Sequence, residues 1–109
     1  MLSVILGAFA AHGLKSRLSE YSLGVFKTAA EYQMAHGLAL IAVAILIKWG
    51  INLSWAGGFF IMGTLLFSGS LYLLALTGMK WLGPITPLGG LCFIIGWIVI
   101  LVQVARFKF

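Results

Sequence analysis

Five polar side chains in an otherwise apolar sequence have the chemistry to bind or transfer something. Glu31, Tyr32, Gln33 and His36 lie close together in the chain, and His12 is the other of the two histidines. A histidine and a carboxyl group inside an apolar segment are the usual components of a proton relay. Two histidines that meet across a helical bundle can ligate a haem iron from both sides. These five residues are therefore the candidate site.

The spacing of these residues limits what one helix can do with them. Tyr32 and His36 are four residues apart and share a helix face, whereas Glu31 is turned by about 140° from His36. Glu31 and His36 therefore need partners on other helices or at the membrane surface. An ionised carboxyl group deep in a membrane costs about 2.5–3.5 kcal/mol, so we expect Glu31 to lie near the headgroups, to face the bundle or to be protonated.

The chain has no local signature for a metal or a cofactor. It contains none of the motifs CxxCH, HxxxH or ExxH, and its single cysteine allows no intrachain disulfide. We therefore predict no metal and no cofactor, and favour an interhelical hydrogen-bond network formed by His12, Tyr32, Gln33 and His36. Two alternatives stay open: a small-solute or proton pathway past Glu31 and the two histidines, and a haem- or quinone-binding redox subunit.

The composition places these residues in lipid rather than water. Hydrophobic residues make up 62% and charged residues 8% of the 109, against roughly 45–50% and about 25% in ordinary soluble domains. So few charges cannot cover a globular surface in water, which excludes a soluble protein. The net charge of +5 comes from seven basic residues scattered between apolar segments. Such scattering is typical of loop ends in membrane proteins and not of a nucleic-acid surface.

Apolar segments and helix-start signals predict three long helices. Residues 53–77 and 85–105 are each long enough to cross a bilayer, since about 20 apolar residues span its core. Residues 20–48 form a still longer helix, which begins after Ser19 as its N-cap. Thr86, between two prolines, is the expected N-cap of the last helix.

The first 14 residues complete the predicted fold. Residues 1–14 are apolar but reach only roughly 21 Å as a helix, which is too short for the hydrocarbon core. We interpret them as the second half of a first transmembrane helix rather than as a cleaved signal peptide, because no charged segment precedes the apolar one. The predicted fold class is an all-α integral membrane four-helix bundle with a truncated first transmembrane helix, forming a single domain over residues 1–109.

Small residues recur every seven positions in the last two predicted helices. In lipid, helices associate through small residues that let their backbones approach closely. We predict that these residues form helix contacts, and a pore lined by small residues is the alternative. They are Ala56, Gly63, Ser70 and Thr77 in the third helix and Gly89 and Gly96 in the fourth.

Four ordered motifs that together cover nearly the whole chain resemble those of a known family. They are GAFAAHGLK at 7–15, TAAEYQMAH at 28–36, FSGSLYLLALTG at 67–78 and LGPITPLGG at 82–90. The chain resembles the YgdD-like family of small bacterial inner-membrane proteins, a domain-of-unknown-function family. Members usually carry a full first helix before the first motif, and Ala10 stands where that motif commonly has glycine.

The resemblance implies a four-helix protein that crosses the bacterial inner membrane several times, and it brings no known catalytic residue, substrate or cofactor. Together with the small-residue spacing, it favours a non-enzymatic structural or accessory membrane protein. Its expected partners are the lipid bilayer and either a second copy of the chain or another membrane protein, with no nucleic acid.

Overall fold

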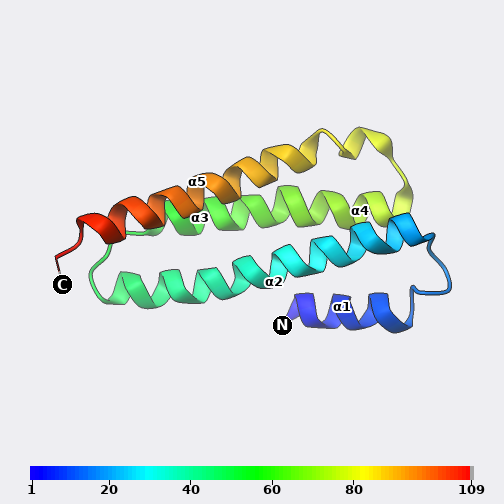
Figure 1. The fold of residues 1–109 in the computed structure, drawn as a ribbon, viewed down its shortest axis with the longest axis horizontal. Helices are drawn as coiled ribbons and strands as arrows, with labels where there is room; N and C mark the ends of the chain where they lie inside the picture. Colours follow the sequence, from blue (N-terminus) through cyan, green and yellow to red (C-terminus); the bar gives the residue numbers. More distant parts are fainter. Residues whose placement is uncertain (109) are drawn as a thin grey trace.

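The computed structural model describes residues 1–108, and every regular element in that range is a helix (Figure 1). Three stretches are long and apolar enough to cross a membrane: Glu20–Lys48, Ser54–Thr77 and Lys80–Arg106. The predicted all-α bundle of four helices is confirmed. In chain order the elements are α1 (Leu2–His12), α2 (Glu20–Lys48), α3 (Ser54–Gly63), the π-helical η1 (Thr64–Ser68), α4 (Gly69–Thr77), the 3₁₀ turn η2 (Lys80–Leu82) and α5 (Ile85–Arg106).

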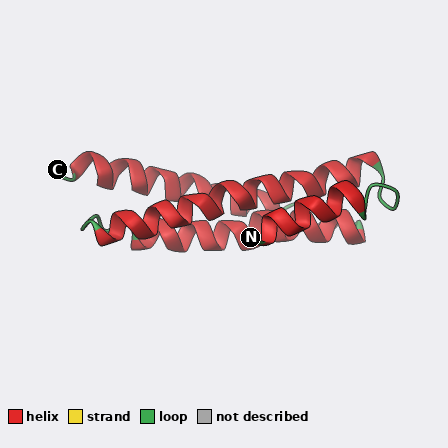
Figure 2. Ribbon diagram, turned by 90° about the horizontal axis from the view of Figure 1, so that it is seen from below, coloured by secondary structure: helices red, strands yellow, loops and turns green. Residues whose placement is uncertain are grey.

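The helices lie side by side in an elongated bundle that measures 52 × 27 × 15 Å (Figure 2). α3, η1 and α4 form one continuous rod, antiparallel to α2, and α5 returns along that rod (Figure 1). The short α1 lies along only the first half of α2, and among residues 1–108 no other helix lies along the second half on that side (Figure 1).

α2 is the longest helix, and its ends carry clear stop and start signals. The Ser19 side chain accepts a hydrogen bond from the Ser22 backbone N–H at 3.1 Å, which caps the helix start. Glu20 in the first turn and Lys48 in the last turn complement the helix dipole. With 29 residues the helix is roughly 43 Å long, which exceeds the hydrocarbon thickness of about 30 Å.

α1 is shorter than expected. It ends at His12, because the backbone N–H groups of Gly13 and Leu14 both donate to the Phe9 carbonyl and the chain then turns. The turned-in Leu14 packs with Ala10 in a buried apolar cluster.

The start of α5 also differs from the expectation. α5 begins at Ile85 with Pro84 in the N-cap position, so the expectation that Thr86 caps the helix is wrong. The Thr86 hydroxyl lies inside the helix and bonds to the Ser70 hydroxyl of α4 at 2.6 Å. The Thr86 side chain therefore bonds to a neighbouring helix instead of capping its own.

Buried apolar side chains form two cores along the bundle axis. The larger joins α2, α3 and α5 and is centred on Phe60 and Phe93. The smaller joins α1, α2 and α4 around Phe26. Apolar side chains also cover the outside, as expected for a surface in lipid, and Leu101 is 69% exposed.

The π-helical segment η1 was not predicted from the sequence. It forms the middle of the rod, between α3 and α4. Ala56, Gly63 and Ser70 are buried as predicted, but Thr77 is exposed and its hydroxyl bonds to the Leu73 carbonyl of its own helix. Assigning Thr77 to the packing face is therefore wrong.

Candidate functional site

The His36 ring is the centre of the buried polar and aromatic residues. Its side chain is 5% exposed, and its Nδ1 lies 2.8 Å from the Tyr32 carbonyl oxygen. A carbonyl oxygen only accepts, so Nδ1 carries the proton and donates. Nε2 is then the acceptor for the Trp97 indole N–H, at 3.1 Å. Both ring nitrogens of a neutral imidazole are thus engaged, one within α2 and one across to α5.

Aromatic rings from three helices enclose this imidazole. The Phe93 ring stacks on it, with centroids 3.5 Å apart and planes 10° apart. The Phe60 ring meets it edge-on at 5.3 Å. The Tyr32 ring packs on Phe67 at 4.7 Å and covers the outer side of the cluster. The imidazole is held in one orientation by its hydrogen bonds and by these rings, so it lies in the core where α2, α3 and α5 meet.

A second set of polar groups joins the helices nearer the α1 end of the bundle. The Tyr72 hydroxyl donates to the Gln33 side-chain oxygen at 2.6 Å, linking α4 to α2. The Ser68 hydroxyl donates to the Ala29 carbonyl at 2.9 Å, linking η1 to α2. Within residues 1–108, no buried side-chain N or O atom lacks a hydrogen-bond partner. Each of these bonds joins residues far apart in sequence, so together they tie α2 to the rod formed by α3, η1 and α4.

In the hydrogen bond between the Ser70 and Thr86 hydroxyls, which joins α4 to α5, the donor can be assigned. The Ser70 hydroxyl donates to the Phe67 carbonyl at 2.9 Å, so its oxygen accepts the proton of the Thr86 hydroxyl. This chain of bonds joins α5 to the end of the π segment. Polar side chains that could serve a reaction are thus used to connect helices.

Glycines allow the backbones of α5 and the rod formed by α3, η1 and α4 to approach closely. A Cβ atom on Gly96 would lie 2.6 Å from a Phe60 ring carbon, and one on Gly63 would lie 2.5 Å from a Phe93 ring carbon. A Cβ on Gly89 would overlap the backbone N of Phe67. These three glycines, which the sequence assigned to helix packing, form the seam between α5 and the rod.

The structure does not bring the two histidines together. The Ser3 hydroxyl bonds to the Met34 sulfur at 3.7 Å, and Gly7 faces Ala30, so α1 runs antiparallel to the first half of α2. This register places His12, which is exposed, roughly 16 Å along the bundle axis from His36. A bis-histidine haem site does not fit this arrangement, and within residues 1–108 no three His, Cys, Asp or Glu side chains gather as a metal site.

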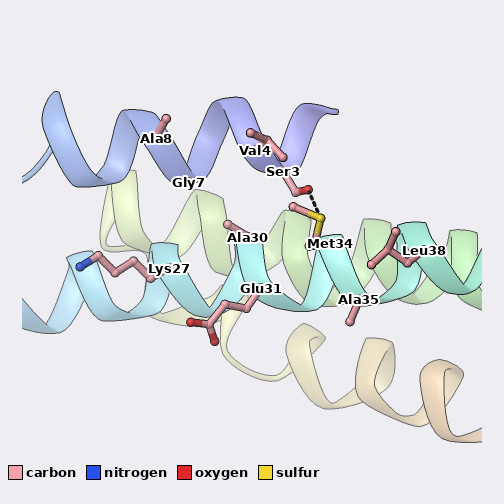
Figure 3. A pocket seen from close by; sticks show the side chains of 10 residues that line it. All are labelled: Ser3, Val4, Gly7, Ala8, Lys27, Ala30, Glu31, Met34, Ala35 and Leu38. Carbon is pink, nitrogen blue, oxygen red and sulfur yellow. Dashed lines mark hydrogen bonds between the residues drawn. The ribbon is translucent and has the colours of Figure 1, made fainter.

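Glu31 also lies apart from His36. It is exposed on α2 and lines a groove beside α1 together with Lys27, and its carboxylate points away from α1 (Figure 3). His36 points instead into the core between α3 and α5. Of the five candidate residues, only Tyr32 and His36 share one cluster, while Gln33 bonds to Tyr72 on another helix.

Sequence reasoning missed three of the residues that complete these networks: Trp97, Tyr72 and Ser68. Trp97 and Tyr72 carried a signal, because an indole N–H or a phenol hydroxyl within an apolar helix needs a hydrogen-bond partner. The signal does not say which residue the partner is. Here the partners are 61 and 39 positions away in the chain.

A bundle with three helices long enough to span a membrane, joined by polar bonds inside an apolar exterior, defines an α-helical membrane protein. The chain belongs to the family described as "Protein of unknown function (DUF423)", whose model matches residues 6–90. This membership confirms the predicted relation to a membrane family of unknown function.

Curated relatives cover almost the entire chain. A UPF0382 membrane protein of Staphylococcus aureus (strain bovine RF122 / ET3-1) is 49% identical over an alignment of 110 positions, which covers 100% of this chain and 88% of that protein. UPF0382 membrane proteins of Staphylococcus haemolyticus (strain JCSC1435) and of Staphylococcus saprophyticus are each 47% identical, over 98% and 94% of this chain and 88% and 86% of their own lengths. No solved structure is a significant match. The chain is accordingly a bacterial membrane protein.

Proposed function

We propose that this chain is a YgdD-like, non-enzymatic accessory protein that crosses the bacterial inner membrane several times. Its partners are the lipid bilayer and either a second copy of itself or another membrane protein. One observation carries the proposal: two of the five candidate side chains, His36 and Gln33, bond to side chains on other helices, in the Trp97–His36 and Tyr72–Gln33 pairs. Such bonds stabilise a bundle, and they occupy the lone pair that His36 would need as a base or a ligand.

A proton or solute pathway is less well supported by the same geometry. A relay needs titratable groups in hydrogen-bond contact or linked by water. Glu31 lines the groove beside α1, whereas His36 faces α3 and α5 from another side of α2. Tyr32 and Phe67 lie in ring contact beside the imidazole, so apolar surface surrounds His36.

Flux through proteoliposomes tests the accessory role against the transport role. Purified full-length chain is reconstituted in liposomes with an imposed pH gradient and a pH-sensitive dye inside. We expect the same decay of the gradient for the wild type, Glu31→Gln and His36→Phe. A decay that is faster with the wild type than in empty liposomes, and that Glu31→Gln abolishes, would overturn the proposal in favour of transport.

Reporter fusions test the multi-pass arrangement. The turn between α2 and α3 lies at the same end of the bundle as the end of α5, and η2 lies at the opposite end (Figure 1). Fusions after Gly50 and after Lys108 should therefore report the same side of the inner membrane, and a fusion after Gly78 the other side. Reporters that place Gly50 and Gly78 on one side would contradict the proposal.

A further inference from the structure

An open groove runs between α1 and α2 on the outside of the bundle (Figure 3). Its volume is about 750 Å³, within the range of about 300–1,000 Å³ typical of small-molecule sites. Its lining includes the small residues Gly7, Ala8 and Ala30. The lining is largely apolar, and its two charged residues are Lys27 and Glu31.

Contacts between helices place Lys27 at the edge of the apolar layer. Ser68 of η1 bonds to Ala29 of α2. Because the rod runs antiparallel to α2, Ser70, two residues further along the rod, is level with Lys27. Ser70 bonds to Thr86 in the first turn of α5. α5 has 22 residues and is roughly 33 Å long, close to the hydrocarbon thickness of about 30 Å. The first turn of α5 therefore marks one edge of this layer, and Lys27 lies at that edge.

The groove has the depth of one leaflet. From Lys27 to Leu38 it follows α2 for roughly 16 Å, about half of the hydrocarbon thickness. A single acyl chain that starts at the membrane surface and ends near the midplane matches these limits.

The groove carries one positive and one negative side chain, Lys27 and Glu31, which could pair with the two opposite charges of a zwitterionic headgroup. Side chains on a helix lean toward its N-terminus, so the ammonium of Lys27 and the carboxylate of Glu31 both extend toward the membrane surface. Figure 3 shows these two groups pointing apart rather than toward each other. The Glu31 carboxylate lies one helix turn inside the edge of the apolar layer. A cation that also donates a hydrogen bond to this carboxylate would stabilise its charge there.

We propose that this groove binds one phospholipid with a phosphoethanolamine headgroup. The phosphate pairs with the Lys27 ammonium, the primary ammonium of the lipid donates to the Glu31 carboxylate, and one acyl chain lies along α1 and α2. A choline headgroup has the same charges but no N–H to donate, and an anionic glycerol headgroup has no cation for Glu31. The inference rests on the proposed membrane placement of the chain.

Lipid retention by the purified full-length chain tests the proposal. Delipidated protein in detergent is mixed with equal amounts of phosphatidylethanolamine, phosphatidylcholine and phosphatidylglycerol, and bound lipids are counted by native mass spectrometry. We expect the wild type to retain phosphatidylethanolamine about tenfold more than phosphatidylcholine, as a charge-assisted hydrogen bond allows. Glu31→Gln should reduce this ratio to about one, and the matched control Glu20→Gln, a carboxyl outside the groove, should leave it unchanged.

A second variant tests the acyl-chain site. Ala8→Trp places an indole in the groove from an exposed position of α1, and it should abolish retention of all three lipids while the circular dichroism spectrum stays that of the wild type. Equal retention of the three lipids by the wild type, a preference for phosphatidylglycerol, or a preference that Glu31→Gln leaves intact would overturn the proposal. A dimer that Ala8→Trp dissociates would also overturn it, because a second copy would then fill the groove. The reporter fusions are read separately, so a failed lipid preference leaves the multi-pass arrangement standing.

Discussion

Gly89 and Gly90 are neighbours in α5 that differ in what a methyl group would meet. A Cβ on Gly89 would lie 2.7 Å from the Phe67 Cα and overlap the Phe67 backbone N. A Cβ on Gly90 would lie 3.8 Å from the nearest Phe67 ring carbon, which is ordinary van der Waals contact. Replacing each glycine by alanine therefore compares a blocked position with an open one on the same helix turn.

The expected magnitude follows because most other terms cancel. Both substitutions gain the same helix propensity, about 1 kcal/mol at most. Only Gly89→Ala must push α5 away from η1, since the obstacle is backbone that cannot rotate aside, and overpacking of this kind costs about 1–3 kcal/mol. We expect Gly89→Ala to lower the free energy of unfolding by about 2 kcal/mol relative to Gly90→Ala. Gly90→Ala should be as stable as the wild type or slightly more stable.

The measurement is reversible unfolding of the purified chain in mixed micelles, with helix content followed by circular dichroism as the denaturing detergent increases. The order of the transition midpoints should be Gly90→Ala, wild type, Gly89→Ala, from the most to the least stable. Equal midpoints for the two variants would refute the close approach of α5 to η1. A greater loss in Gly90→Ala would mean that the other face of α5 forms the seam.

Further variants test the polar bonds with the same unfolding measurement. Trp97→Phe leaves Nε2 of His36 without its donor and should cost about 1 kcal/mol, and His36→Phe added to it should cost less than His36→Phe alone. Additive effects of these two substitutions would contradict the bond. Tyr72→Phe and Gln33→Leu should each cost about 0.6–1 kcal/mol, with a coupling of similar size in the double variant. Ser68→Ala should cost no more than about 1 kcal/mol, because the Ala29 carbonyl keeps its place within the helix, and a larger loss would contradict this view of the bond.

Much of the fold could be predicted because it depends on local or averaged properties of the chain. The apolar composition selects lipid as the solvent, and apolar segments of sufficient length predict the spanning helices. The Ser19 cap follows from local chemistry at the start of α2. Gly89 and Gly96 lie in the helix seam because small residues are a general solution to close packing in lipid.

Two predictions failed because the role of a side chain in the folded protein differed from the role that its local sequence pattern indicates. Thr77, the last residue of α4, is exposed although its spacing matches the buried residues, and its hydroxyl bonds to the Leu73 carbonyl of its own helix. Thr86 has the sequence context of a cap, but Ser70 of α4 offers its hydroxyl a bond at 2.6 Å. A local rule names the preferred role of a side chain, and a neighbouring helix can offer it a different one.

The sequence by itself determined the solvent, the number of long helices and which polar residues are exceptional in lipid. Helical periodicity shows which residues share a face, as it does for Tyr32 and His36. Only the tertiary structure decided that the imidazole of His36 meets Trp97 and that Glu31 faces a groove beside α1. The physical reason is that the axial register and rotation of each helix follow from packing against its neighbours, and one helix's sequence does not contain that information.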